Sequence, residues 1–306
     1  MLYFLRKPKK NKNYIITIAI GKKHIKDWKR YALPSWKYYC DRHDIGLVYY
    51  NKFLDNEKSQ CFKTPTWHRL LIGKFLFLNF KSKIENVCFL DTDIIISPIA
   101  PNVFQNFDNK CVGLISVRKN LPESFDLITK KIAVFRKKFL DTSYPLKGIL
   151  NYSLEELYKI HNLKTQKDEF CGGVFLFNLK RYNDFFYKIY FLYKKNTWSI
   201  TRGGCQAHLN YHLQSSKKVR IQRLNYKFQA IWLYEMALKY PFLYLKKYKS
   251  DQKLIAKCIE SSLLENHFLH FAGSLFEGKM WKNNYLFDED FNLPFFKKIK
   301  NSILNI

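Results

Sequence analysis

The sequence predicts an α/β protein, a single domain in which helices flank a mostly parallel, mixed sheet. Short apolar, β-branched runs alternate along the chain with longer stretches of helical character, which is the order of a sheet built from β-α units. The 306 residues suit one large domain of this class. No Pro-, Gly- or Ser-rich linker divides them, so we expect a single domain followed only by a short C-terminal segment.

Strands and helices are expected in alternation through the first half of the chain. Pro34 should break or kink the first helix, because proline lacks the N–H that an interior helical position needs. The second helix is amphipathic, with Trp67, Leu70, Leu71 and Leu78 at helical spacings. The strands are expected at residues 14–21, 46–50, 86–90 and 111–117, and the helices at 24–41 and 64–80.

The second half of the chain begins with a charged, helical stretch. Ser153 and Glu156 match a capping box, which predicts a helix N-terminus there. Gly172 and Gly173 open the next apolar run, which suggests backbone pressed close to a ligand or another chain. The expected elements are a helical region over 122–167, strands over 170–178 and 267–273, and helices over 180–195 and from residue 203 onward.

The most informative motif is Asp91-Thr92-Asp93, which follows the apolar run of residues 86–90. Burying two carboxylates at a strand end is costly without a counter-charge. Alternation puts Asp91 and Asp93 on the same side of an extended segment. Two hard oxygen ligands suit a divalent cation such as Mn2+ or Mg2+, and ligands of open α/β sheets bind at the carboxyl ends of strands. We therefore expect a metal site that holds a phosphorylated substrate; the alternative is a solvated turn.

The net charge of +28 favours partners that carry phosphate: nucleic acid, anionic lipid or a sugar nucleotide. The lysines are spread along the chain, however, as a lysine-rich compositional bias would also produce. The sequence contains no RNA-binding aromatic signature, zinc finger or convincing helix-turn-helix motif. We therefore expect no specific nucleic-acid partner.

The sequence favours a cytoplasmic location, with peripheral contact at an anionic membrane surface as an option for the C-terminal segment. No apolar run approaches the length of a membrane span. Residues 1–5 are apolar and precede a cluster of cations, which is the reverse of the order in a signal peptide. The seven cysteines include no C-x-x-C pair, so neither a zinc site nor a redox motif is indicated.

Further motifs follow one another along the chain. They are Thr66–Lys74, which carries Arg69 and precedes Asp91-Thr92-Asp93; Cys171-Gly172-Gly173-Val174-Phe175-Leu176-Phe177-Asn178-Leu179; Cys205-Gln206-Ala207-His208-Leu209-Asn210; and His270-Phe271-Ala272-Gly273 with Lys279-Met280-Trp281. In this order they resemble the nucleotide-sugar transferases of the GT-A fold, most closely glycosyltransferase family 8. The family usually has Asn where this chain has Cys171 and Asp where it has Cys205, so the sugar end of the site departs most.

The resemblance implies a Rossmann-like GT-A fold over residues 1–285, the catalytic domain, with a basic amphipathic segment over 286–306. It implies metal-dependent transfer of a sugar, with retention, from a nucleotide sugar (a UDP-sugar) to a hydroxyl acceptor such as a glycan. Mn2+, or Mg2+, would be held by Asp91, Asp93 and His270. Gln206 would lie near the anomeric carbon. The donor would be bound by Thr17, Ile18, Ala19, Arg69, Asp91, Thr92, Gly273 and Lys279.

Several residues keep a second interpretation. His267 competes with His270 as a ligand, although strand alternation should turn it to the opposite face. Lys279 is either a phosphate clamp or a solvated lysine. Arg69 either reaches the diphosphate, orients Asp91, or forms a structural ion pair. Asp168 and Glu169 either approach sugar hydroxyls or form a solvated loop.

Two other functions stay open at the level of the sequence. One is an inverting transferase of the same fold with a carboxylate base such as Glu169. The other is a basic nucleic-acid-binding protein in which the Asp pair is incidental.

Overall fold

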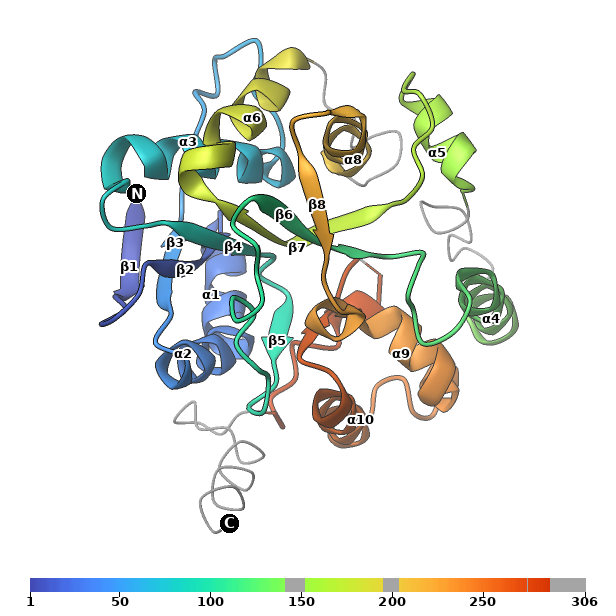
Figure 1. Ribbon diagram of the computed structural model, residues 1–306. Coiled ribbons are helices and arrows are strands. Elements are labelled where there is room, and N and C mark those ends of the chain that lie inside the picture. The colour runs from blue at the N-terminus through green and yellow to red at the C-terminus, as the bar shows by residue number, and fades with distance from the viewer. Residues whose placement is uncertain (141–151, 195–203, 274, 287–306) are drawn as a thin grey trace.

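A seven-stranded mixed sheet, in the order β1-β3-β2-β4-β7-β6-β8, forms the centre of the computed structural model (Figure 1). The residues described are 1–140, 152–194, 204–273 and 275–286. Strands β2, β3, β4, β6 and β8 run in one direction, and β1 and β7 run against them. The predicted α/β class, with a mostly parallel mixed sheet flanked by helices, is therefore confirmed.

The strands of the large sheet are β1 (Leu2–Arg6), β2 (Asn13–Ile18), β3 (Gly46–Tyr50), β4 (Asn86–Leu90), β6 (Cys111–Ser116), β7 (Phe170–Asn178) and β8 (Arg220–Arg223). A second, three-stranded sheet is ordered β5 (Ile94–Ile96), β10 (Phe268–His270), β9 (Ala230–Ile231). It joins segments that are far apart in the sequence, because β10 pairs antiparallel with β5 and parallel with β9.

Helices cover both faces of the large sheet (Figure 1). Alternation along β2 sends Ile15 into one buried cluster and Ile16 into the other. Helices α1 and α2 contribute to the first cluster, and α3, α6 and α8 to the second. The α-helices are α1 (Lys22–Tyr31), α2 (Leu33–Arg42), α3 (Pro65–Phe80), α4 (Phe125–Phe139), α5 (Leu154–Ile160), α6 (Leu179–Leu192), α8 (Gln206–Ser215), α9 (Trp232–Lys239) and α10 (Gln252–Glu265).

Most of the predicted elements are confirmed, with boundaries displaced by a few residues. The helix expected over 24–41 is two helices that meet at Ala32, and Pro34 is the second residue of α2, where no helical N–H is needed. The capping box of Ser153 and Glu156 is present at the start of α5.

Strand β1 was not predicted, because residues 1–5 were considered only as a targeting segment. It forms the edge of the sheet, antiparallel to β3. Strand β8 and helices α9 and α10 were likewise left unassigned. Apart from Leu286, the predicted C-terminal segment 286–306 lies outside the described residues. Among the helices that the structure describes, none has both the length and the apolar character needed to cross a bilayer.

Candidate metal centre

Strand pairing brings the Asp91-Thr92-Asp93 turn and His270 together. The turn connects β4, in the large sheet, to β5, in the small one. Ile94, the first residue of β5, pairs with His270 of β10, and the Phe271 N–H donates to the Asp93 carbonyl at 3.0 Å. Helix α2 fixes β5 in turn, because Trp36 Nε1 donates to the Ile94 carbonyl at 2.7 Å.

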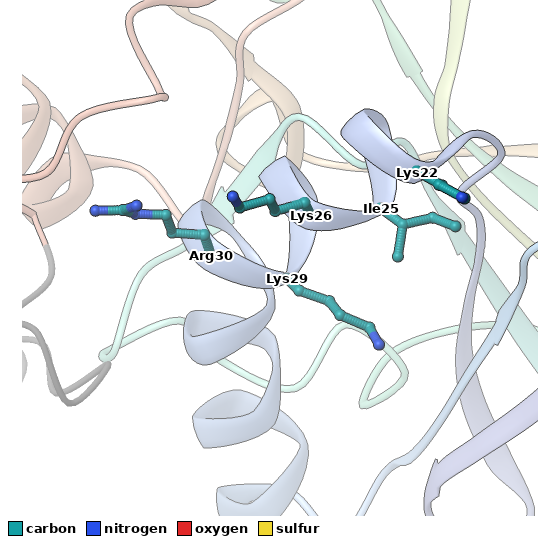
Figure 2. A pocket seen from close by; sticks show the side chains of 5 residues that line it. All are labelled: Lys22, Ile25, Lys26, Lys29 and Arg30. Carbon is teal, nitrogen blue, oxygen red and sulfur yellow. The ribbon is translucent and has the colours of Figure 1, made fainter.

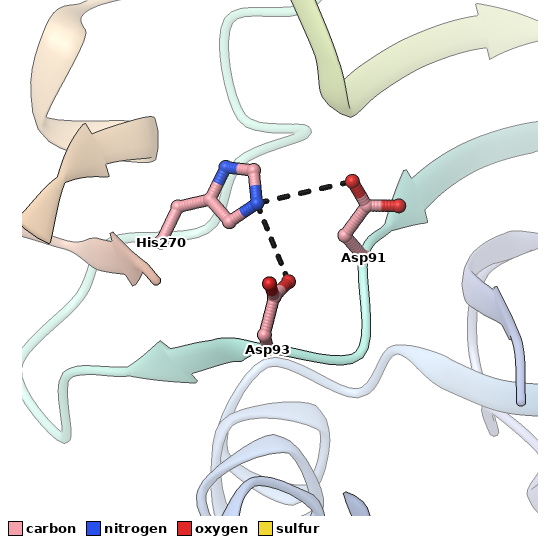
Figure 3. Close-up of side chains that lie close together, drawn as sticks. All are labelled: Asp91, Asp93 and His270. Carbon is pink, nitrogen blue, oxygen red and sulfur yellow. Dashed lines mark ion pairs between the residues drawn. The ribbon is translucent and has the colours of Figure 1, made fainter. Parts of the chain in front are cut away.

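The side chains of Asp91, Asp93 and His270 converge (Figure 3). His270 Nε2 lies 3.3 Å from Asp93 Oδ1 and 3.8 Å from Asp91 Oδ2. One potential ligand atom from each residue lies within 4.8 Å of the other two. The imidazole is 3% exposed and the two carboxylates are 28% and 25% exposed, so the carboxylate side of the cluster opens outward. Two carboxylates and one imidazole form a donor set that fits Mn2+.

The pKa values of both Asp91 and His270 are raised, so each side chain holds its proton more tightly than usual when no cation is bound. Burial raises the pKa of Asp91, and Arg69 offsets that only in part. Burial by itself lowers the pKa of His270, but the charge and hydrogen bond of Asp93 outweigh it, so the net pKa lies well above 6.5. Protons and a metal ion therefore compete for the same atoms.

Arg69, on α3, forms a part-buried ion pair with Asp91 of the cluster. Its Nη2 lies 3.0 Å from Asp91 Oδ1, and its Nε donates to the Thr66 carbonyl at 2.8 Å. A third bond runs from Nη1 to the Gly172 carbonyl. Of the expected roles of Arg69, the structure displays the pair with Asp91. The remaining guanidinium bonds go to backbone, which fixes the side chain rigidly.

The two glycines at the start of β7 make room for side chains of the cluster. A Cβ on Gly172 would lie 2.8 Å from Arg69 Nη1, and one on Gly173 would lie 2.3 Å from His270 Cε1. The Gly173 carbonyl also accepts from the Asp91 N–H at 2.8 Å. The close approach inferred from these glycines is thus to side chains of the same chain.

His267 lies outside the cluster. It precedes β10, and its ring packs against Phe228, with ring centroids 4.8 Å apart. Burial, followed by the charge of Lys227, lowers its pKa to about 4. The structure therefore brings His270, and not His267, to the carboxylates.

Replacing His270 with Ala is expected to weaken Mn2+ binding, whereas replacing His267 with Ala should change only stability. The reason is that His270, and not His267, offers an imidazole nitrogen to the carboxylate pair. Isothermal titration with Mn2+ on both variants measures the difference. A loss of Mn2+ affinity in the His267 variant, with none in the His270 variant, would contradict the site.

The residues expected to contact the nucleoside, Thr17, Ile18 and Ala19, lie at the end of β2 beside β4. Thr17 is fully buried and donates to the Leu90 carbonyl at 2.6 Å, so its hydroxyl supports the strand that carries the Asp pair. Thr92 Oγ1 lies 2.7 Å from His24 Nε2, which ties the metal turn to α1. Thr17 and Ala19 are 0% exposed and Ile18 is 9% exposed, so these side chains lie in the core and not on an open surface.

Gln206, at the start of α8, is held by a buried carboxylate. Its Nε2 donates to Glu169 Oε1 at 2.6 Å, and Glu169 Oε2 accepts from Arg118 Nε at 2.6 Å. Glu169 and Asp168 are 3% and 0% exposed, so the interpretation as a solvated loop was wrong. Asp168 instead accepts from Ser116 and pairs with Arg223. Among the described residues, no hydrogen bond joins Gln206 to Asp91, Asp93 or His270.

Gly273 and Lys279 lie on the segment that follows β10. Gly273 has φ of 107°, a conformation open mainly to glycine, and Gly278 packs against its carbonyl. Lys279 is exposed at the end of a short 3-10 helix, Glu277–Lys279. A buried ion pair from Arg136 Nε to Glu277 Oε1, at 2.9 Å, anchors this helix to α4. Lys279 therefore extends from an anchored helix, and Gly278, the residue before it, packs against Gly273.

Helix α1 presents a group of exposed cations. Lys22, Lys26, Lys29 and Arg30 line a pocket together with Ile25, and their side chains spread outward from the helix (Figure 2). None of these cations has a carboxylate partner among the described residues. Like charges four residues apart destabilise a helix slightly, so this face is suited to an anionic partner.

Sequence reasoning missed Arg118, His24 and Gln229 as parts of this region. Arg118 follows the strand predicted over 111–117, and His24 begins the helix predicted over 24–41, but neither residue belongs to a motif. Gln229 is fully buried, and its Nε2 lies 3.0 Å from His270 Nδ1. A buried amide in a stretch without a predicted element gives no signal in the sequence.

Comparisons with known proteins give structural likenesses only. No protein-family model matches the chain, and no curated protein matches it either. Similar solved structures include a glycosyltransferase involved in glycosylation of the major capsid of PBCV-1, at 10% identity and a TM-score of 0.47, over 88% of this chain and 98% of that one.

Two other solved structures resemble the chain to a similar degree. The glycosyltransferase GlyE of Streptococcus pneumoniae TIGR4 is 13% identical with a TM-score of 0.45, over 96% of this chain and 64% of that one. The galactosyltransferase LgtC, in complex with donor and acceptor sugar analogs, is 13% identical with a TM-score of 0.43, over 95% of each chain. At this level of similarity, any functional argument must rest on the residues of the site itself.

Proposed function

We propose that this protein is a metal-dependent glycosyltransferase of the GT-A type, which moves a sugar from a UDP-sugar to a hydroxyl acceptor such as a glycan. The observation that carries the proposal is the convergence of Asp91, Asp93 and His270 at the carboxyl end of a central strand. Open α/β sheets bind ligands at this end of their strands. A cation held here would face outward on the carboxylate side, where a diphosphate could reach it.

The proposed mechanism assigns a role to the bound cation, to Lys279, to Gln206 and to the cations of α1. A bound Mn2+ or Mg2+ would act as a Lewis acid that neutralises charge on the leaving diphosphate. Lys279 would add a point charge to the same diphosphate. The bond to Glu169 engages the amide nitrogen of Gln206 and leaves its carbonyl oxygen for a developing oxocarbenium charge. The exposed cations of α1 would attract the anionic donor.

We favour retention over inversion because of the surroundings of Glu169. An inverting enzyme needs a carboxylate that is free to take a proton from the acceptor. Glu169 is buried, and both of its carboxylate oxygens are already engaged, one by Arg118 and the other by Gln206, so neither oxygen is free for an acceptor hydroxyl. NMR of the product's anomeric proton tests this choice, and an inverted product would refute retention.

A panel of nucleotides and nucleotide sugars, with and without Mn2+, tests the proposed function. Bound ligand stabilises the fold by mass action, so the correct donor should raise the unfolding temperature only when Mn2+ is present. Preference for GDP over UDP would refute the uridine donor alone. Salt-sensitive binding of RNA or DNA, with no response to any nucleotide sugar, would favour the nucleic-acid alternative and refute the transferase.

The proposal also includes the domain boundaries and the cytoplasmic location that the sequence predicts. The catalytic domain would be residues 1–285 of a cytoplasmic protein, and residues 286–306 would contact an anionic membrane surface. Cosedimentation with vesicles of phosphatidylserine, compared with phosphatidylcholine, tests that contact. Equal sedimentation with both would refute it.

Replacing Lys279 with Ala is expected to weaken UDP binding in the presence of Mn2+ by about ten- to a hundredfold, since a hydrogen bond to a charged group contributes ~1.5–3 kcal/mol. Titration calorimetry with UDP measures it. Lys81→Ala is the matched control, because Lys81 is also exposed but follows α3 at the end remote from Arg69. Equal affinities in the parent and the Lys279 variant would remove Lys279 from the site.

A further inference from the structure

Gln229 contacts His270 on the side of the imidazole that faces away from Asp91 and Asp93. It ends a 3-10 helix, Tyr226–Gln229, directly before β9, and β9 pairs in parallel with β10. This pairing brings the Gln229 amide beside His270, with 3.0 Å between Nε2 and Nδ1. The Gln229 side chain is completely buried. Its only described partner is thus the imidazole nitrogen that faces away from the carboxylates.

The other half of this amide lacks a partner. Gln229 Oε1 is buried and has no hydrogen-bond partner among the described residues. A buried, unsatisfied carbonyl costs about 1–3 kcal/mol, so such an atom calls for an explanation. A half-turn of the amide exchanges oxygen and nitrogen with almost no change in shape. That turn would place the acceptor, instead of the donor, against His270 Nδ1.

The chemistry of metal binding determines which orientation is needed. His270 turns Nε2 toward Asp91 and Asp93, so Nε2 is the nitrogen that can bind a cation. A neutral imidazole that binds through Nε2 carries its proton on Nδ1. Nδ1 must then donate a hydrogen bond, and a second partner that accepts this bond fixes the ring and raises its basicity.

We propose that Gln229 is the positioning residue of the metal site: its amide oxygen accepts the Nδ1 proton of His270 and so holds Nε2 toward the cation. The same bond satisfies the orphan oxygen. Gly173 makes the arrangement possible, because a Cβ there would lie 2.6 Å from Gln229 Nε2 and 2.8 Å from His270 Nδ1. This inference rests on the metal site of the proposed function and adds a residue that selects the tautomer.

The test is Mn2+ affinity, measured on the full-length chain without nucleotide by the loss of the free-Mn2+ EPR signal. Gln229→Leu should weaken Mn2+ binding about 10–100-fold, the range for removal of a group that orients a metal ligand. Gln229→Glu should keep the parental affinity or improve it, because a carboxylate also accepts from Nδ1. Rescue by Glu is the readout that a merely structural role would not give.

The control is Asn183→Leu, since Asn183 is a buried amide with an unpaired oxygen in a different part of the fold, on α6. It should lower the unfolding temperature in EDTA without changing Mn2+ affinity. Equal weakening by Gln229→Leu and Gln229→Glu, or parental affinity in both, would overturn the inference and leave the metal site intact. If the parent itself bound no Mn2+, the metal site and the inference would both be refuted.

Discussion

Replacing Asp93 with Asn is expected to abolish Mn2+-dependent sugar transfer while the fold survives. Asp93 Oδ1 is the carboxylate oxygen nearest to His270 Nε2, at 3.3 Å. Asn keeps the shape of the side chain but removes one of the two negative charges of the cluster. Groups that only orient a ligand are worth about 10–100-fold in metal affinity, so loss of a charged ligand should cost more than ~100-fold.

The fold should survive because the Asp93 backbone, and not its side chain, holds β10 in place. Some stability will be lost, and its pH dependence has a definite sign. Asp93 raises the pKa of His270 above 6.5, so the protonated imidazole stabilises the fold below that pH and ceases to do so as the pH rises through the folded-state pKa. The variant should therefore be destabilised most in acid.

Initial rates with Mn2+, together with thermal unfolding in EDTA at several pH values, measure both effects. Asp184→Asn is the matched control, since Asp184 is a 61% exposed carboxylate that pairs with Lys74 on the surface. It should change neither the rate nor the pH dependence. Near-parental activity of the Asp93 variant with Mn2+ would show that the carboxylate pair does not hold the cation.

The central strands were predictable from sequence because they are buried on both faces. β4 and β7 are buried over nearly their whole length, so they appear as unbroken apolar runs. Edge strands lack this signal: β1 is only half-buried, and β8 carries Arg at both ends. Neither could be distinguished from a loop by its pattern of apolar residues.

The candidate site was predictable where a residue adjoins such a strand. Asp91 and Asp93 stand out because they end an apolar run, and His270 is found through the family resemblance. The carboxylates of Asp168 and Glu169 look solvated in the sequence, yet both are buried because Arg223 and Arg118 reach them from other elements. Partners of this kind are fixed by tertiary packing, which a single sequence does not reveal.

Replacing Arg69 with Met is expected to lower the free energy of unfolding of the metal-free protein by about 1.5–3 kcal/mol, the range for hydrogen bonds to charged groups, because the Arg69–Asp91 pair is part-buried. Met fills much of the same volume, and the loss of charge is the main change. Asp91 would then face Asp93 without its guanidinium, which lies 3.0 Å away in the parent. The carbonyls of Gly172 and Thr66 would also lose a donor.

Mn2+ should restore more stability to the Arg69 variant than it adds to the parent, because the cation then supplies the positive charge that Asp91 has lost. Urea unfolding with EDTA and with saturating Mn2+ measures the two increments. Lys74→Met is the matched control: Lys74 is on the same helix and pairs with Asp184 on the surface, where an ion pair contributes only about 0–1 kcal/mol. If the Arg69 variant lost no more stability than this control, the ion pair with Asp91 would not support the site. An equal response to Mn2+ in variant and parent would show that the cation and Arg69 do not share Asp91.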